Sequence, residues 1–600
     1  MPRLLPFSFF LVVFALFAQA NPPLEVVSPE SLNLNSEAFA PIDGWVRKLI
    51  EAENIPGGIV AIGRGDRLVY LQKWGNCQQN PVPRPVEWDT MWDMASCGKV
   101  EALAPALAML VSQGKISYDD PVTKYLPELA NHGKEKIKIW HLCTHTSGIR
   151  DGYSWEGTPD DIWQRITQLP LKAEPGERFE YSCLGCIILG KVVERVTGET
   201  YADFTRNHIF IPLGMTDTMF LPDPERVKRC AVTEFMDGRW IQGVPNDTRA
   251  RRMKQGTGNG ANFSTVSDVA IFASVMLNRG EFTAPDGSKQ RLFSPEVYDK
   301  MVSFYPTTSG SRGLNWDHRS EKPNRGILQS PQAIGHGGYT GTSIWIDPNF
   351  GTFVIVLSNR LNWHGPSQPN IYPTAGKIAD RVIDAVHDPH DVVKIREEVK
   401  NSVLRPEDAD FAFLKGKKVG LITEFDATFE KMREQGIDVT RLSSEGLNQR
   451  RFRIQDVRGL DVLVFDCLPT NPGNSGKIAE LGRVMQSAAD LDLELVVVDH
   501  PNPMGMTDVS DDFPAPGAET DANFRRLPAS YAMTVGELAL LFRSEYRMTT
   551  LKLKVVPFEP TELTVPAEPT VVPTLELKSD VEFFRFQRGL YLIYKRVSEE

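Results

Sequence analysis

The spacing of apolar residues changes from helical to strand-like and back along the first two thirds of the chain. Residues 42–54 repeat apolar positions with the period of an amphipathic helix, and residues 57–74 alternate as two strands around a turn at 63–66. The segment 102–111 is apolar on every side, which is typical of a helix buried in a core. Pro105 interrupts this segment, so we predict a kink or a break between two helical pieces there.

Later segments complete this first unit. Residues 343–346 and 352–358 predict two strands of an antiparallel hairpin. Two more helices are expected, one ending near Leu277 and one over about 375–385. Helices combined with an antiparallel sheet indicate an α+β fold, with a helical domain beside the sheet. We place this domain at 21–390.

The pattern changes after a charged, non-periodic linker, which we place at 391–410. Short apolar strands then alternate with helices through 411–600, which predicts an α/β domain with a parallel, doubly wound sheet. No G-x-G-x-x-G follows the first of these strands, so the sequence does not support a nucleotide cofactor. The predicted strands are 418–423, 438–442, 460–466 and 493–499, and the predicted helices end near 435 and cover 477–489.

Composition and charge narrow the function classes. The chain has 600 residues with 41% apolar and 24% charged content, which is typical of a globular protein of two or more domains. Its net charge of −11, without a long basic run, argues against nucleic acid or an anionic membrane as partner.

Residues 1–20 have the pattern of a secretory signal peptide. Arg3 precedes an apolar run, and small residues at Ala18 and Ala20 form a cleavage site. We expect cleavage near Ala20, export to the periplasm or the exterior, and no transmembrane span in the mature chain. An uncleaved anchor is the alternative, but the apolar run is short for a span.

The seven cysteines show neither the regular spacing of a disulfide scaffold nor that of a zinc site, and their number is odd. Cys183 and Cys186 form a C-x-x-C pair among apolar residues at the start of a helix. Buried packing and a redox motif are both readings of this pair, and the apolar surroundings favour packing.

Three short motifs stand at element boundaries in a fixed order. Ser96 and Lys99 form a Ser-x-x-Lys sequence, and the i, i+3 spacing puts both side chains on one face of a helix turn. A desolvated, partly neutral lysine can take the proton that a serine loses when it attacks a carbonyl. Tyr181 begins a second helix, and His336 precedes a strand. A lone Ser-x-x-Lys is a weak signal, whereas the ordered triple is specific.

With these motifs the chain resembles the serine β-lactamase and penicillin-binding-protein-like hydrolases, in the branch of class C β-lactamases, D-aminopeptidases and esterases. The resemblance runs from about Ile42 to about His387 and implies an α+β β-lactamase-like domain that acts through a covalent acyl-enzyme. It implies that Ser96 is the nucleophile rather than only a helix cap. It also implies that Lys99 is the base and that Tyr181 shares the proton transfer.

The resemblance also assigns the substrate-binding strand. His336 would lie beside the substrate carboxylate, where the family has Lys or His, and Gly337 and Gly338 would let the substrate lie along the strand. The main-chain N–H groups of Ser96 and Tyr339 would form the oxyanion hole.

Three further positions bear on this site. Cys183 replaces an Asn that the family often uses to bridge the lysine and a substrate amide. A thiol is a weak donor and acceptor, so we expect inefficient β-lactam hydrolysis but intact acyl transfer. Cys97 and Cys183 either pair as a disulfide or stay free. His145 lies in the family's T-H-T-S-G turn, which we read as structural rather than as a catalytic base.

The region 411–600 resembles the N-terminal α/β half of the exo-β-N-acetylmuramidases of cell-wall recycling. The family's S-P-E-H-G motif keeps its acid here as Glu445 but loses the His, and its F-D-x-Q-D-x-G motif keeps Asp466 but has Pro469 at the second Asp. Because glycoside hydrolysis generally needs two carboxylates, we predict that this domain is not catalytic. Glu445 and Asp466 then mark either a vestigial saccharide site or a spacer in which Asp466 caps a turn.

Together these observations predict an exported serine hydrolase that forms an acyl-Ser96 intermediate on amide or ester bonds. Muropeptides or D-amino-acid peptides are the expected small-molecule or peptide substrates, because the second region resembles a cell-wall enzyme. No metal or other cofactor is expected. The alternative is a non-catalytic cell-wall-binding or sensor protein with degenerate sites. Pro469 favours that alternative for the second region, whereas Lys99 and Tyr181 oppose it for the first.

Overall fold

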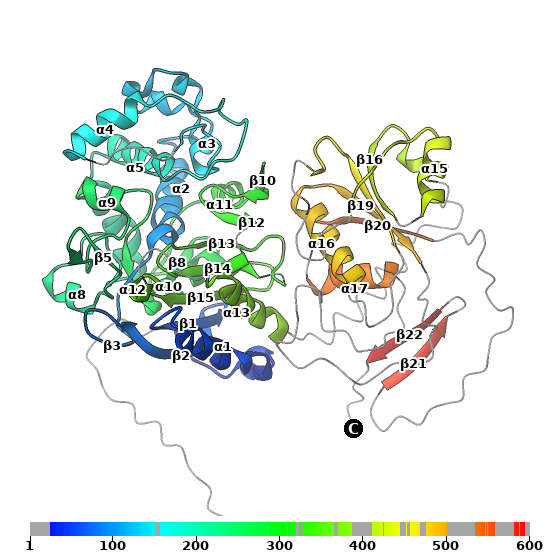
Figure 1. The fold of residues 1–600 in the computed structure, drawn as a ribbon, viewed down its shortest axis with the longest axis horizontal. Helices are drawn as coiled ribbons and strands as arrows, with labels where there is room; N and C mark the ends of the chain where they lie inside the picture. The colour runs from blue at the N-terminus through cyan, green and yellow to red at the C-terminus, as the bar shows by residue number, and fades with distance from the viewer. Residues whose placement is uncertain are drawn as a thin grey trace, which may run out of the picture.

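The chain folds into two units, which Figure 1 shows in blue to green and in yellow to orange. The computed structural model describes 24–386 and 411–557, together with two strands between 581 and 594. The positions left out of those two ranges are 151–155, 285, 309, 320–322, 327, 365–369, 424, 444–451, 453–455, 468–475, 501–534, 547 and 549.

A nine-stranded antiparallel sheet forms the base of the first unit. Its strand order is β10-β11-β12-β13-β14-β15-β1-β2-β3, so strands from the two ends of this unit lie side by side. The strands are β1 (Gly57–Arg64), β2 (Arg67–Gln78), β3 (Arg84–Pro85), β10 (Tyr305–Thr307), β11 (Gly310–Arg312), β12 (Asp317–Arg319), β13 (Ile334–Gly337), β14 (Ser343–Asp347) and β15 (Thr352–Ser358).

Helices cover both faces of this sheet (Figure 1). Successive side chains of a strand point to opposite faces. Accordingly Ile59 and Ala61 of β1 lie in one core with residues of α10 (Val266–Leu277). Val60 and Ile62 lie in a second core with residues of α1 (Pro41–Glu51) and α13 (Tyr372–Ala385).

The remaining helices and the short strands of the first unit surround the start of one buried helix. A π-helical turn, Lys99–Leu103, precedes α2 (Ala104–Ser112), and Pro105 lies in the first turn of α2. Proline has no N–H for the carbonyl of residue 101, and the wider π turn accommodates this. Of the predicted kink or break, the structure shows a local change from π-helical to α-helical geometry next to Pro105, not an interruption of the helix. The other elements are α3 (Ile139–Cys143), α4 (Pro159–Gln168), α5 (Cys183–Thr197), α6 (Tyr201–Thr205), α7 (Ile211–Leu213), α8 (Pro224–Arg229), α9 (Thr248–Met253), α11 (Pro295–Met301), α12 (Leu361–His364), β4 (Trp92–Asp93), β5 (Phe235–Met236), β6 (Arg239–Trp240), β7 (Phe263–Ser264), β8 (Glu281–Thr283) and β9 (Lys289–Arg291).

The second unit is a parallel sheet of order β17-β16-β18-β19-β20 packed with helices. Its strands and helices alternate along the chain, as expected for a doubly wound sheet. The elements are β16 (Lys418–Thr423), α15 (Asp426–Glu434), β17 (Asp438–Arg441), β18 (Val462–Asp466), α16 (Gly476–Asp490), β19 (Glu494–Asp499), α17 (Val535–Glu545) and β20 (Lys552–Pro557), followed by the antiparallel pair β21 (Val581–Phe586) and β22 (Gly589–Tyr594).

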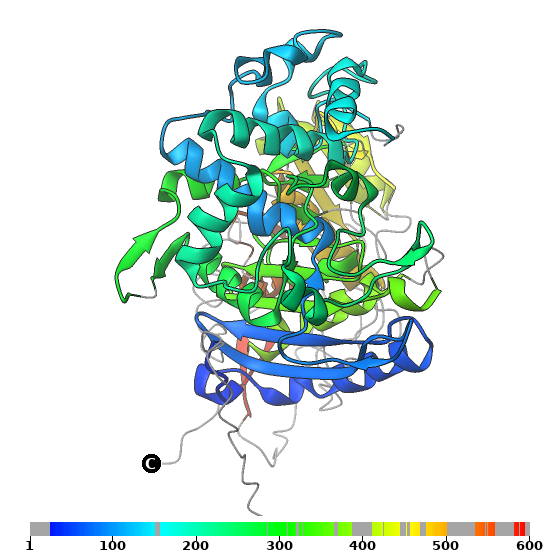
Figure 2. The ribbon, with the colours of Figure 1, turned by 90° about the vertical axis from the view of Figure 1, so that its left-hand side faces the viewer.

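The two units touch. One apolar cluster contains side chains of α13 together with side chains of α16 and α17. A hydrogen bond crosses the same boundary, from Gln332 Nε2 to Thr550 Oγ1 at 3.0 Å. In Figure 2 the second unit accordingly lies behind the first.

The predicted fold class is confirmed in both units, including the antiparallel hairpin of β14 and β15. Helix α13 begins at Tyr372 rather than near 375, because a proline in the first turn of a helix does not end it. The predicted signal peptide and the predicted linker lie outside the described residues. Within the described part of the chain, one helical stretch, Ala95–Ser112, is long and apolar enough to span a membrane, and most of it is buried inside the fold.

Candidate active site

Ser96 lies in a tight turn that its neighbours hold in a strained conformation. The 3-10 turn Ala95–Cys97 follows β4, and Ala95 has a φ of 45°, which is costly for a residue other than glycine. Asp93 Oδ1 accepts a hydrogen bond from the Ala95 N–H at 2.9 Å, and the Met94 N–H donates to the Asn262 carbonyl at 2.9 Å. A strained residue held this firmly is typical of a functional site.

Two side chains contact the Ser96 hydroxyl directly. Lys99 Nζ lies 2.9 Å from Ser96 Oγ, and Tyr181 OH lies 2.9 Å from the same oxygen. The i, i+3 spacing accounts for the lysine, whereas Tyr181 arrives from the segment just before α5. The structure thus brings together the three residues expected to be catalytic.

The Lys99 side chain is fully buried and has three further neighbours. Its Nζ donates to the Asn259 carbonyl at 2.6 Å and lies 3.7 Å from Cys183 Sγ. It also lies 5.3 Å from the centre of the Tyr181 ring, within the range of a cation–π interaction. None of these neighbours is a carboxylate.

Opposing effects act on the pKa of Lys99. Burial lowers it, whereas Cys183 and Tyr181 raise it once they carry negative charge, and with those charges the pKa lies above the usual value for lysine. Burial in turn raises the pKa of Tyr181 to about 12, although the Lys99 ammonium opposes that rise. Lys99 and Tyr181 therefore titrate as a coupled pair, in which an ammonium and a phenolate stabilise each other.

His145 lies behind Tyr181 rather than against Ser96. Its ring centre is 4.4 Å from that of Tyr181, and its Nδ1 accepts a hydrogen bond from the Ser182 N–H at 3.2 Å. The His145 carbonyl also accepts from the Glu180 N–H at 2.9 Å. These contacts fix the segment that carries Tyr181, so His145 acts on the site through that tyrosine.

Strand β13 brings His336 to the other side of the nucleophile. Its ring centre lies 6.1 Å from that of Tyr181, and its side chain is almost fully buried. Cys97 Sγ donates to the His336 carbonyl at 3.4 Å, which ties the strand to the nucleophile turn.

The two glycines after His336 allow close packing. A Cβ on Gly338 would clash with Thr342 Oγ1 and lie 2.6 Å from the Met94 carbonyl, so only glycine lets this strand approach the nucleophile turn. A Cβ on Gly337 would clash with the side-chain amide of Asn324. The Tyr339 side chain, next along the chain, is 46% exposed.

No disulfide joins any of the seven cysteines, all of which lie in the described part of the chain, so Cys97 and Cys183 are not paired with each other in this structure. Burial raises the pKa of Cys97 to about 12, and Cys97 accepts a hydrogen bond from Thr342 Oγ1 at 3.5 Å. Cys183 and Cys186 lie buried in the first turn of α5 and form no disulfide with each other. The C-x-x-C sequence is therefore reduced in this structure.

Sequence reasoning assigned no role to three residues at the site. Asn259 supplies a backbone carbonyl to Lys99, and Asn262 supports the nucleophile turn through its own carbonyl. Glu101, two residues after Lys99, is fully buried and accepts a hydrogen bond from Asn262 Nδ2 at 2.6 Å. Only the odd presence of a charged residue inside an otherwise apolar helix marks Glu101 in the sequence.

In the second unit, Asp466 is fully buried at the end of β18. Its Oδ2 accepts from Thr423 Oγ1 at 2.6 Å, and its Oδ1 pairs with His500 Nε2 at 2.6 Å. His500, which sequence reasoning had not singled out, is also fully buried and stacks on Phe425. Glu445 lies outside the described residues.

Comparison with known proteins now identifies the class of this site. Residues 42–375, more than half of the chain, match the family model for β-lactamases. The chain belongs to the β-lactamase family and is a serine hydrolase of the superfamily that includes the penicillin-binding proteins. Residues 400–567 match the model for the N-terminal domain of the exo-β-N-acetylmuramidase NamZ.

Similar proteins include an Escherichia coli (strain K12) protein provisionally named D-alanyl-D-alanine carboxypeptidase. It is 29% identical over 433 residues, covering 63% of this chain and 98% of the relative. A relative of the same name from Salmonella agona (strain SL483) is 28% identical over 407 residues, covering 60% and 92%.

Solved structures with a similar fold include a class C β-lactamase, at 18% identity and a TM-score of 0.48, covering 59% of this chain and 97% of that one. An octameric penicillin-binding protein homologue from Pyrococcus abyssi is 24% identical with a TM-score of 0.44, covering 57% and 75%.

Proposed function

We propose that the protein is an exported hydrolase that cleaves amide or ester bonds through an acyl-Ser96 intermediate. The observation that carries this proposal is the position of the Ser96 hydroxyl, 2.9 Å from both Lys99 Nζ and Tyr181 OH. A nucleophile hydrogen-bonded to a base, with the base held by further groups, is the arrangement that covalent catalysis requires.

In the acylation step, Ser96 Oγ attacks the carbonyl carbon and its proton passes to the coupled Lys99–Tyr181 pair. Whichever member of that pair lacks a proton is the acceptor, and both lie at hydrogen-bond distance from Ser96 Oγ. The same proton then protonates the leaving amine or alcohol. Water then attacks the acyl carbon and gives a proton to the same pair. The bond to Ser96 Oγ breaks, Oγ takes the proton back, and the free acid is released.

The strand β13 is proposed to bind the acyl donor. The ring centres of His336 and Tyr181 lie 6.1 Å apart, and Gly338 lets the strand lie close against the nucleophile turn. A substrate backbone is proposed to lie along this strand as an added edge. The N–H groups of Ser96 and Tyr339 are proposed to hold the oxyanion.

Peptides ending in D-amino acids, or muropeptides, are the proposed substrates. Relatives that align with this chain over most of their own length bear the name D-alanyl-D-alanine carboxypeptidase. The second unit matches a domain of a cell-wall glycosidase. Cys183 in place of an amide disfavours β-lactams as efficient substrates. Export follows from the signal-peptide pattern of 1–20 and suits such substrates.

The second unit is proposed to bind cell-wall material or to serve as a scaffold, not to cleave glycosides. Its sequence has Pro469 where the family has a carboxylate. The remaining acid, Asp466, is buried and already engaged by Thr423 and His500. A buried carboxylate that already makes two hydrogen bonds within the protein is poorly placed to flank a scissile bond.

Labelling separates this proposal from a protein that binds without catalysis. The full chain and its Ser96→Ala variant are treated with a fluorescent fluorophosphonate and then assayed with D-alanyl-D-alanine peptides and p-nitrophenyl esters. Ser96-dependent labelling and turnover of at least one substrate are expected. A chain that neither labels nor turns over any of these substrates would favour the binding protein.

A further inference from the structure

A buried polar chain runs from the nucleophile helix to the surface of the first unit. Glu101 accepts from Asn262 Nδ2 at 2.6 Å and lies close enough to Ser264 for that side chain to lower its pKa, and Ser264 Oγ lies 2.8 Å from Thr218 Oγ1. Thr218 Oγ1 in turn donates to Asp268 Oδ2 at 2.9 Å.

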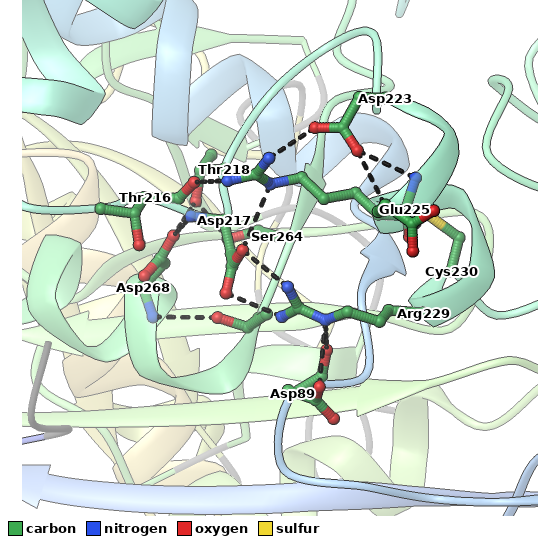
Figure 3. A network of polar contacts seen from close by, with 12 residues as sticks. Asp89, Thr216, Asp217, Thr218, Asp223, Glu225, Arg229, Cys230, Ser264 and Asp268 are labelled. Carbon is green, nitrogen blue, oxygen red and sulfur yellow. Dashed lines mark hydrogen bonds and ion pairs between the residues drawn. The ribbon is translucent and has the colours of Figure 1, made fainter. Parts of the chain in front are cut away.

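The outer end of this chain is an ion-pair cluster, which Figure 3 shows. Asp268 Oδ2 accepts from the Asp217 N–H at 2.8 Å, and Asp217 makes two hydrogen bonds with Arg229, at 2.8 and 2.7 Å. Arg229 also pairs with Asp89 at 3.1 Å. Arg229 thus neutralises the outer carboxylate, that of Asp217, whereas in the part of the chain that the structure describes no cation hydrogen-bonds to Asp268 or Glu101.

The inner end of the chain supports the catalytic turn. The segment 257–264 passes directly beneath Ser96: the Ala261 N–H donates to the Ala95 carbonyl at 3.0 Å, and the Met94 N–H donates to the Asn262 carbonyl at 2.9 Å. The same segment presents the Asn259 carbonyl to Lys99 Nζ at 2.6 Å. A Cβ on Gly260 would clash with the Ala95 carbonyl, so the segment 257–264 packs against the nucleophile turn with no space for a larger residue there.

We propose that Glu101 is a positioning residue of the hydrolase. In its protonated form it holds the segment 257–264 against the nucleophile turn and so keeps Lys99 Nζ at hydrogen-bond distance from Ser96 Oγ. This proposal rests on the proposed roles of Ser96 and Lys99. Glu101 acts through Asn262 and touches neither the substrate nor Ser96.

The protonated form is the one that this environment favours. Burial is the main cause that raises the pKa of Glu101 to about 7, and the nearby Asp268 carboxyl raises it further, while the bonds to Asn262 and Ser264 lower it. A protonated carboxyl can donate to one neighbour and accept from the other, as a glutamine amide can. An ionised one only accepts, and it adds negative charge close to Asp268.

The titratable and charged groups around Glu101 are few. Asp268 reaches it from α10, Cys97 from the nucleophile turn, and Lys99 is two positions before it on its own helix. Burial raises the pKa of Asp268 to about 7, so the two carboxyls compete for ionisation near neutral pH. Loss of the Glu101 proton should loosen the segment that carries Asn259 and also strengthen the hold on the Lys99 proton.

The test compares pH profiles of ester hydrolysis for the full chain, Glu101→Gln, Glu101→Ala and Asp268→Asn. The wild type should lose kcat/KM above pH of about 7, following the ionisation of Glu101. Glu101→Gln should lack this fall and stay within about threefold of wild type at low pH, a difference below 1 kcal/mol. Glu101→Ala should be slower by up to ~10²-fold at every pH, as expected for a misplaced catalytic group. Asp268→Asn should shift the fall to lower pH.

A fall above neutral pH that persists unchanged in Glu101→Gln would overturn the proposal, as would a Glu101→Ala variant with the wild-type profile. Fluorophosphonate labelling of Ser96 in the wild type is measured in parallel. If the wild type labels and the pH profiles do not separate, only the role of Glu101 fails. If the wild type does not label, the proposed function itself fails. Circular dichroism at each pH distinguishes loss of activity from loss of fold.

Discussion

At the scale of single residues, the proposed reactivity of Ser96 depends on two polar groups that contact its hydroxyl, Lys99 Nζ and Tyr181 OH. Among the described residues, Lys99 Nζ donates to the Asn259 carbonyl and hydrogen-bonds to no carboxylate. Burial and the neighbouring Tyr181 and Cys183 then set its proton affinity together. Small changes at any of these side chains should therefore alter the rate.

Lys99→Ala should lower kcat/KM by the ~10²–10⁴-fold typical of a general acid–base group, because it removes one of the two groups that contact Ser96 Oγ. The measurement is hydrolysis of p-nitrophenyl esters, with the fold checked by circular dichroism. Lys191→Ala, on the outer side of α5 and paired with Glu194, is the matched control and should be unchanged. A loss of less than about tenfold in Lys99→Ala would assign the base to another residue.

Cys183→Asn should raise turnover of amide substrates relative to esters. The thiol lies 3.7 Å from Lys99 Nζ, and an amide there can both accept from the lysine and donate to a substrate carbonyl. The measurement is the ratio of kcat/KM for a D-alanyl-D-alanine peptide to that for a p-nitrophenyl ester. Cys186→Asn, one turn away in the same helix, controls for the loss of a buried thiol. An unchanged ratio would mean that residue 183 does not set the preference.

The sequence alone was sufficient to predict that Ser96, Lys99, Tyr181 and His336 lie in one site, because each belongs to a short motif, and the structure brings them together. Their chemical roles stay predictions. Asn259 was not predictable, since it contributes a backbone carbonyl that any residue carries, from 160 positions away. Glu101 stood out only as a charge in an apolar helix. The residues that Glu101 contacts come from distant parts of the chain, so the sequence of its own helix does not reveal them.

At the scale of elements, the nucleophile sits where two irregular pieces meet. A strained 3-10 turn leads into a π-helical turn, and regular helix starts only at α2. Helix α10, strand β13 and the segment 257–264 all pack on this region. Proline and apolar spacing predicted a kink or a break in this helix, but the π-helical turn found there depends on these neighbours.

His318 of β12 gives the first unit a pH-dependent stability. Its ring nitrogens lie 3.2 Å from the Ala333 carbonyl and 2.9 Å from the Val302 carbonyl, next to β13 and α11. Burial, helped by the charge of Arg325, lowers the pKa of His318 to about 3 from 6.5. Between these values the unfolded chain binds the extra proton, so the free energy of unfolding decreases as the pH falls.

We therefore expect the melting temperature of the full chain to fall as the pH drops below about 6.5, and to fall less steeply in His318→Gln. His208→Gln, at an exposed histidine paired with Glu199, is the control and should follow the wild type. Identical slopes for the wild type and His318→Gln would exclude His318 as the source. The measurement is differential scanning calorimetry across that pH range.

At the scale of the whole molecule, a serine hydrolase is joined to a unit that matches the model for the N-terminal domain of the exo-β-N-acetylmuramidase NamZ, and the two share an apolar cluster. Side chains of α13, α16 and α17 belong to that cluster, and Gln332 bonds to Thr550. The alternation of strands and helices predicted the second fold. Its docking on the first unit was not predictable, because the apolar residues involved look like ordinary core residues in the sequence.

The second unit should leave glycosides intact. The full chain in a Ser96→Ala background, incubated with a chromogenic N-acetylmuramic acid glycoside, should release no chromophore, because Asp466 is buried and bonded and Pro469 cannot replace a carboxylate. Release that disappears on adding Glu445→Gln would show a working glycosidase and contradict this account of the second unit.

The central claim is that Ser96 carries the acyl group. The most direct measurement is intact-protein and peptide mass spectrometry after reaction with a slow ester or a fluorophosphonate. The account predicts one added acyl or phosphonyl group, located on Ser96, in the wild type and in a Ser274→Ala control, which removes another buried serine, in α10. It predicts none in Ser96→Ala, with turnover lost in parallel. Modification at another residue, or ester turnover that persists undiminished in Ser96→Ala, would contradict it.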